Sequence, residues 1–297
     1  MQKTERGRAR TTRDECRRYR PLLYSFDTRA RVLTTTTDSF EPAIAGQWEL
    51  SKRRIRETLI AEYGVTNYEQ KIADFIDLEA APFSVVALHN LFMKHVRVSF
   101  TSGAYYASLV ASGALGERIL NQLILTLRSD YADHPATTTK IATRQSFQNW
   151  PPVVEVLTKW GVIGPDTRSA FLELNRLRND AVHYDRQLDE SNARAEALAA
   201  AKLIQSIVGA VFPPIGGPPR FIANTPGMGF IARDQERNPL VQHFYLPACI
   251  LVSPNHRIEP YSDQASDDDT YQDRFPELSD AEFAEHLRSA TGLSGPA

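Results

Sequence analysis

A cluster of residues that break helices and strands, PPIGGPP at positions 213–219, divides the sequence into two unlike parts. Proline lacks a backbone N–H group and glycine leaves the backbone unconstrained, so regular structure rarely continues through such a run. Apolar residues recur at helical spacing before the cluster, whereas short apolar runs bounded by turn residues follow it. We therefore expect a mainly α-helical protein, with an antiparallel helical bundle over residues 81–212 and a small β-rich appendage with an acidic tail over residues 213–297.

The helical part contains several segments whose apolar residues share one face. Two of them predict an accessory helical hairpin over residues 48–80, in which Gly64 ends the first helix and Asn67 caps the second. Residues 132–149 are polar and irregular, and Pro135 makes a helix unfavourable there. The expected helices cover residues 48–63, 67–78, 83–100, 104–131, 152–160, 165–184 and 190–212.

The two ends of the chain carry opposite charge. Residues 1–20 contain eight basic and three acidic side chains, whereas residues 259–297 contain ten acids and two arginines. Residues 1–47 show little periodicity, so we expect a basic, largely flexible arm that attracts phosphates non-specifically. The acidic tail is expected to be disordered up to a short helix near residues 280–288. Strands of the appendage are expected at residues 221–223, 229–233, 240–246 and 248–252.

The helix that includes residues 171–184, FLELNRLRNDAVHY, carries an arginine in the middle of its apolar face. A guanidinium keeps its charge and is almost never buried without a partner, so the position of Arg178 needs an explanation. Asn179 and His183 lie one turn apart on the flank of the same face. Glu117, at the edge of the apolar stripe of residues 104–131, is the expected partner of the Arg178 fork. Small residues on that helix, Gly113 and Gly116, would let another backbone approach closely.

Arg178, Asn179 and His183 form an R-N-x3-H arrangement. This resembles the R-x4-6-H motif of the HEPN family, whose members are helical-bundle ribonucleases and nucleotide-binding proteins, and the resemblance covers roughly residues 83–212. It implies a HEPN-like antiparallel bundle, an acidic residue such as Glu117 on an earlier core helix, and symmetric dimers in which both motifs line a groove. It also implies RNA cleavage without a metal, leaving a 2′,3′-cyclic phosphate.

The residue types suit that chemistry. RNA can be cleaved by its own 2′-hydroxyl, which needs a proton acceptor, a proton donor and fixed positive charge at the phosphorane oxygens. His183 suits either proton-transfer role and Arg178 the charge-stabilising role, while Asn179 positions the histidine or a phosphate oxygen. Arg178 and His183 are about 140° apart around an ideal helix. Either the helix is irregular at this point, or two copies of the chain supply residues to one shared cleft.

Other features limit the remaining function classes. Cys16 and Cys249 are far apart and lack metal-ligand spacing, which fits a reducing compartment. No run approaches the roughly 18 apolar residues of a membrane span, and the Arg-rich start lacks the apolar segment of a secretory signal. Phosphate-loop, dinucleotide-fingerprint and zinc-helix motifs are absent. We therefore expect a cytoplasmic protein with no membrane association, cofactor or metal.

Three hypotheses remain at this stage. The first is a metal-independent HEPN-type endoribonuclease, a homodimer acting on RNA as a toxin or phage-defence effector, with an antitoxin or regulatory partner. The second is a non-catalytic HEPN-like module that binds a nucleotide, RNA or a protein. The third is a structural adaptor that recruits partners through the basic arm and the acidic tail. Each motif residue also has an ordinary structural explanation, because an arginine can pair with a carboxylate and a histidine can simply pack.

Overall fold

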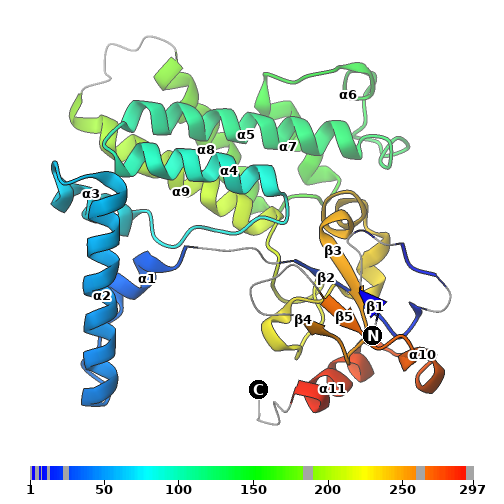
Figure 1. The fold of residues 1–297 in the computed structure, drawn as a ribbon. Coiled ribbons are helices and arrows are strands. Elements are labelled where there is room, and N and C mark those ends of the chain that lie inside the picture. The colour runs from blue at the N-terminus through cyan, green and yellow to red at the C-terminus, as the bar shows by residue number, and fades with distance from the viewer. Residues whose placement is uncertain are drawn as a thin grey trace. The chain divides into compact units, whose positions relative to one another are not determined.

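The computed structural model is mainly helical, with two small sheets (Figure 1). It describes residues 2–3, 7, 9–11, 14–22, 27–182, 190–258 and 265–291. The chain forms two compact units. The first, which we call the helical unit, contains residues 25–83 and 87–211. The second, the mixed unit, contains residues 1–24, 84–86 and 212–297.

A long apolar helix, α5 (Tyr105–Leu127), is the centre of the helical unit. It packs against α4 (Ala87–Thr101), α8 (Pro165–Val182) and α9 (Glu190–Val211), which run beside it in Figure 1. Small buried alanines on α9 allow these helices to approach closely, because a methyl group leaves room for the facing side chains. The alanines are Ala197, Ala200 and Ala201. None of the helices in the described residues combines the length and apolar character that a bilayer crossing requires.

The remaining helices of this unit follow the predicted pattern in most places. The accessory hairpin is present as α2 (Pro42–Tyr63) and α3 (Tyr68–Asp77), and α7 (Trp150–Lys159) lies near its predicted position. Asn67 precedes α3 in a left-handed conformation and its side chain makes no capping hydrogen bond. The prediction that residues 132–149 contain no helix is wrong at α6 (Thr139–Thr143), a short helix that buries Ile141.

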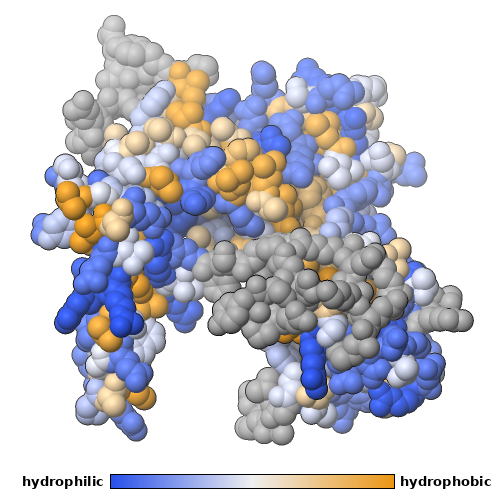
Figure 2. Space-filling model, in the orientation of Figure 1, coloured by the Kyte–Doolittle hydropathy of each residue, from blue (hydrophilic) through white to orange (hydrophobic). Residues whose placement is uncertain are grey.

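The core of the accessory hairpin includes a segment that we expected to be flexible. Helix α1 (Arg29–Thr34) buries Ala30 and Leu33 against Leu59, Ile72 and Phe75 of α2 and α3. Leu59 is the only buried residue of α2, and Figure 2 shows mostly hydrophilic side chains over that helix. The hairpin therefore needs α1 because α2 presents too little apolar surface to form a core with α3 alone.

The mixed unit is built from both ends of the chain. Strand β2 (Arg18–Pro21) pairs antiparallel with β3 (Cys249–Val252), and β1 (Gln2–Lys3) pairs with β5 (Ala265–Asp267), which also pairs with β4 (Arg257–Ile258). The prediction of a largely flexible arm over residues 1–47 is therefore wrong for most of its described residues. The partners of the two arm strands, β5 and β3, lie more than 200 residues away in the sequence. Local periodicity therefore gives no sign of the pairing.

The predicted strands of the appendage were only partly correct. Residues 248–252 contain β3, as expected. Residues 221–223 and 229–233 meet only in a single antiparallel bridge between Phe221 and Ile231. Residues 241–245 are helical rather than extended, because Val241, Phe244 and Tyr245 are buried at helical spacing.

The charged ends of the chain pair with each other inside the mixed unit. Asp267, which is 4% exposed, accepts hydrogen bonds from Arg17 Nε at 2.9 Å and from the Ser253 backbone at 3.0 Å. Arg18 is fully buried and pairs with Asp280, and Arg10 pairs with Glu236. The prediction of a disordered acidic segment at residues 267–269 is therefore wrong, because a buried guanidinium needs a carboxylate partner. The short helix expected near residues 280–288 is confirmed as α11 (Asp280–Thr291).

Around these charges lies an apolar core that joins the two sheets to α11. Helix α10 (Tyr271–Arg274) lies beside a smaller cluster that contains Cys16 and Leu278. The main core consists of Leu22, Ile222, Phe230, Ala232, Ile250, Val252, Ala265, Phe283, Ala284 and Leu287. Because the arginines of the arm and the acids of the tail help to hold this unit together, the adaptor hypothesis loses much of its basis.

Asp267→Ala is expected to lower the free energy of unfolding by about 3 kcal/mol or more, because it leaves the buried Arg17 guanidinium without its main partner. Asp269→Ala, an exposed carboxylate two residues later, is the matched control and should change it by less than about 0.5 kcal/mol. Urea denaturation followed by circular dichroism measures both. Equal stability of the two variants would contradict the structural role of Asp267.

Candidate functional site

The position of Arg178 on α8 depends on a glycine of α5. A methyl group added to Gly113 would lie 2.5 Å from Cγ and 2.8 Å from Cβ of Arg178. Both atoms belong to the rigid first part of the side chain, so the arginine could not move aside without moving α8. Gly116 has the same function one turn later, where a methyl group would lie 2.7 Å from Trp150 and 2.9 Å from Leu174. The close approach of another backbone that the sequence predicted is present at Gly113, where the added methyl group would lie 3.8 Å from Cα of Arg178, whereas the space at Gly116 is filled by side chains.

Arg178 and Glu117 form the predicted contact. Nη2 of Arg178 donates to Oε2 of Glu117 at 3.0 Å, and Nη1 donates to Oδ1 of Asn179 at 3.0 Å. The two side chains are 26% and 28% exposed, so the pair is half-buried rather than sealed in the core. Solvent screening therefore limits its contribution to stability. Three of the five guanidinium N–H groups have no acceptor among the described residues.

An open hollow of about 640 Å³ lies beside this pair. A second guanidinium, that of Arg118, lies 5.3 Å from the ring of Phe92 and has no carboxylate partner in the described part of the chain. Two guanidinium groups and one carboxylate therefore line one hollow, which favours an anionic ligand. The lining residues are Val110, Ala114, Glu117, Arg118, Asn121, Gln122, Leu125, Arg178 and Val182.

Two amides connect the hollow to the surrounding structure. The side chain of Asn121 donates to the carbonyl of Phe147 at 2.9 Å and accepts from its N–H at 2.7 Å, which fixes the loop before α7. Gln122 Oε1 lies 3.1 Å from Nε2 of the buried His89. Sequence reasoning placed Asn121 on the correct side of α5 but missed the roles of Gln122 and Arg118. Arg118 directly follows Glu117 and Gln122 directly follows Asn121 in the sequence, which was the available signal.

The structure brings together three of the four residues expected at the site: Arg178, Asn179 and Glu117. His183 lies outside the described residues, and α8 is described as far as Val182, which lines the hollow and is 48% exposed. No group of three His, Cys, Asp or Glu side chains able to hold a metal ion occurs within the described ranges.

Neither a scan against protein-family models nor searches of the curated proteins and of the solved structures found a match to this chain.

Gly113→Ala is expected to lower the free energy of unfolding by about 1–3 kcal/mol, because the added methyl group overlaps the stem of Arg178. The matched control is Gly209→Ala on α9, where the methyl group would lie 3.6 Å from the nearest atom, Cβ of Pro82. That change should be neutral or should stabilise by about 0.5–1 kcal/mol through helix propensity. Thermal and urea unfolding distinguish the two. A Gly113→Ala protein as stable as Gly209→Ala would show that α5 and α8 are not closely packed here.

His89 predicts a pH dependence of stability. Burial lowers its pKa from 6.5 to about 4. The unfolded chain therefore protonates the His89 imidazole at a higher pH than the folded protein does. The stability that depends on neutral His89 is complete above pH 6.5. It is lost as the pH falls from 6.5 toward 4, by roughly 1.4 kcal/mol per pH unit.

His89→Asn should therefore lose less stability than the parent protein between pH 7 and pH 4. His95→Asn, which changes an exposed histidine of the same helix, should keep the parental slope. Urea denaturation at a series of pH values gives the slopes. Equal slopes for the parent and His89→Asn would show that His89 is not held neutral.

Proposed function

We propose that the helical unit is a HEPN-like bundle and that the protein is a metal-independent endoribonuclease. In this proposal RNA is cleaved by attack of its own 2′-hydroxyl, at a composite site formed by two copies of the chain. The observation that carries the proposal is the Arg178 guanidinium, held by Glu117 and Asn179 at the edge of an open hollow, with three N–H groups that have no acceptor in the described part of the chain. A toxin or phage-defence role is part of the proposal and rests on the resemblance alone.

The contacts of Arg178 support a charge-stabilising role. Glu117 fixes one side of the planar fork, so the remaining donors are oriented before any substrate binds, and preorganised donors stabilise developing charge most effectively. Arg118 adds a second positive charge within the same hollow. Together these groups would hold a phosphodiester and the extra negative charge of its phosphorane.

The shape of α8 supports the two-copy arrangement. The helix is continuous from Pro165 to Val182, so no break in it separates Arg178 from the last described residue of this segment. With about 140° between the two positions on an ideal helix, a phosphate bound by Arg178 of one copy would receive its imidazole from His183 of the other. In the proposed reaction the 2′-oxygen bonds to phosphorus as one His183 takes its proton. The P–O5′ bond breaks, and the protonated His183 of the other copy gives a proton to the departing 5′-oxygen.

One observation favours the alternative, a non-catalytic HEPN-like module that binds a nucleotide, RNA or a protein. Arg178 is already hydrogen-bonded to Glu117 and to its own neighbour Asn179, and such an arrangement can serve packing or binding alone. The two proposals differ in one measurable property, because only the first requires His183 to transfer a proton.

The test is incubation of the purified full-length protein with single-stranded RNA in excess EDTA. We expect cleavage that leaves 2′,3′-cyclic phosphate ends, and a loss of about a hundredfold or more for His183→Ala and for Arg178→Ala. The matched controls are His95→Ala and Arg176→Ala, which remove an exposed histidine of the helical unit and an exposed arginine half a turn before Arg178. Both controls should cleave RNA at the parental rate.

Absence of cleavage by the parent protein, or equal cleavage by His183→Ala, would overturn the nuclease proposal. The binding alternative is then tested by fluorescence anisotropy with labelled RNA and nucleotides. It predicts that Arg178→Ala weakens binding while His183→Ala binds like the parent.

A further inference from the structure

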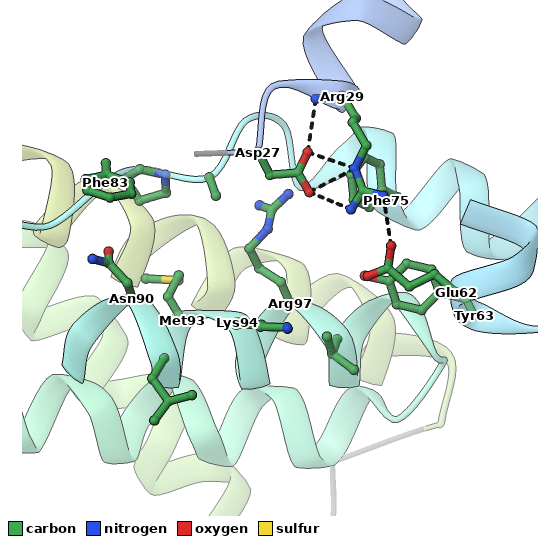
Figure 3. Close-up of a pocket in the computed structure, with 14 residues that line it drawn as sticks. Asp27, Arg29, Glu62, Tyr63, Phe75, Phe83, Asn90, Met93, Lys94 and Arg97 are labelled. Atoms are coloured by element: carbon green, nitrogen blue, oxygen red, sulfur yellow. Dashed lines mark hydrogen bonds and ion pairs between the residues drawn. The ribbon is translucent and has the colours of Figure 1, made fainter. Parts of the chain in front are cut away.

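A second pocket lies in the helical unit, between α4 and the layer formed by α1, α2 and α3 (Figure 3). Its volume of about 430 Å³ is within the range of small-molecule sites. It shares no lining residue with the hollow beside Arg178, and all of its lining residues belong to the helical unit.

Two carboxylates of the pocket are bound by one arginine. Arg29 donates to both oxygens of Asp27, at distances from 2.8 to 3.2 Å, and its Nη1 donates to Glu62 at 2.8 Å. Burial by itself raises the pKa of Asp27, but the hydrogen bonds from Arg29 lower it more, so the net direction is downward. These three side chains therefore form an internally satisfied group at one side of the pocket.

Arg97 is a buried cation that is held by neutral acceptors. Only 6% of its surface is exposed, and its guanidinium donates to the carbonyl oxygens of Leu78 and Glu79 and to the amide oxygen of Gln205. No carboxylate lies within ion-pair distance among the described residues, and Nε and one N–H of Nη2 have no acceptor there. A buried guanidinium with unused donors in the wall of a pocket is suited to binding an anion.

A second cation of α4 lines the pocket. Lys94 lies three residues before Arg97, is exposed, and forms no ion pair with a described residue. Figure 3 shows the Arg97 guanidinium pointing from α4 toward Asp27, whereas the Lys94 side chain stays close to the helix. The lining contains three cations and two carboxylates, so the pocket has a net charge of +1. Its electrostatic complement is a single negative charge.

The other end of the pocket is apolar except for the amide of Asn90. Figure 3 shows Phe83, Met93 and the amide of Asn90 together, away from the group formed by Asp27, Arg29 and Glu62. An amphiphilic ligand fits this division, with its charged end at Lys94 and Arg97 and its apolar end against the aromatic and thioether side chains.

We propose that this pocket binds a small organic monoanion, a singly charged carboxylate or phosphodiester attached to a flat ring. The oxyanion contacts Lys94 and Arg97, and the ring packs against Phe83 and Met93. The proposal is independent of the nuclease proposal, because it depends on no residue of the Arg178 hollow.

The test is isothermal titration of the full-length protein with two monoanions and their neutral counterparts. Benzoate is compared with benzamide, and 3′,5′-cyclic AMP with adenosine. At least one anion should bind about tenfold more tightly than its neutral counterpart, the factor expected for one charge-assisted hydrogen bond. Which anion binds identifies the carboxylate or the phosphodiester as the ligand class.

The test variant is Lys94→Gln, which should weaken binding of that anion about tenfold and leave the neutral counterpart unaffected. Lys94 is exposed, so the variant should fold normally. Lys159→Gln on α7 removes an exposed lysine away from the pocket and should bind like the parent. The proposal is overturned if neither anion binds more tightly than its neutral counterpart, or if Lys94→Gln binds the anion as tightly as the parent protein.

Discussion

The close contact between α5 and α8 is the constraint on which the arrangement of the helical unit depends. Because Gly113 and Gly116 have no side chains, Arg178 and Leu174 of α8 and Trp150 of α7 pack directly on the α5 backbone. This contact fixes the position along α5 at which the Arg178 guanidinium meets Glu117, one turn after Gly113. A larger uncharged residue at Gly113 would therefore disturb the Arg178–Glu117 geometry without changing the charge of the site.

The arginines of this protein serve two different purposes. In the mixed unit, Arg10, Arg17 and Arg18 pair with acids near or beyond residue 236, and this pairing joins the two ends of the chain. In the helical unit, Arg97 and Arg178 keep N–H groups without an acceptor among the described residues, and both line open space. Paired charges stabilise a fold, whereas unused donors in a concavity favour an anionic ligand.

Helix α4 contributes to both concave sites. One face carries Lys94 and Arg97 into the pocket beside α1–α3. The other side supports the hollow beside Arg178, because His89 contacts Gln122 and Phe92 lies under the Arg118 guanidinium. A shift of α4 would therefore alter the walls of both sites. This is a physical route by which a ligand in one site could affect the other.

The sequence by itself determined most of the helices and one functional contact. Helical periodicity is local, so the segments that became α4, α5, α8 and α9 were recognisable. The Glu117–Arg178 pair was recognisable too, since Arg178 interrupts one apolar stripe and Glu117 lies at the edge of another. Only the tertiary structure decided the partners of the described residues of the first 22 positions. The pairing of β2 with β3 and of Arg17 with Asp267 joins residues more than 200 positions apart, and composition alone made both segments look disordered. The pocket around Arg97 was invisible for the same reason, because its walls come from α1 to α4 and from the segments that precede α1 and α4, and no single segment carries its pattern.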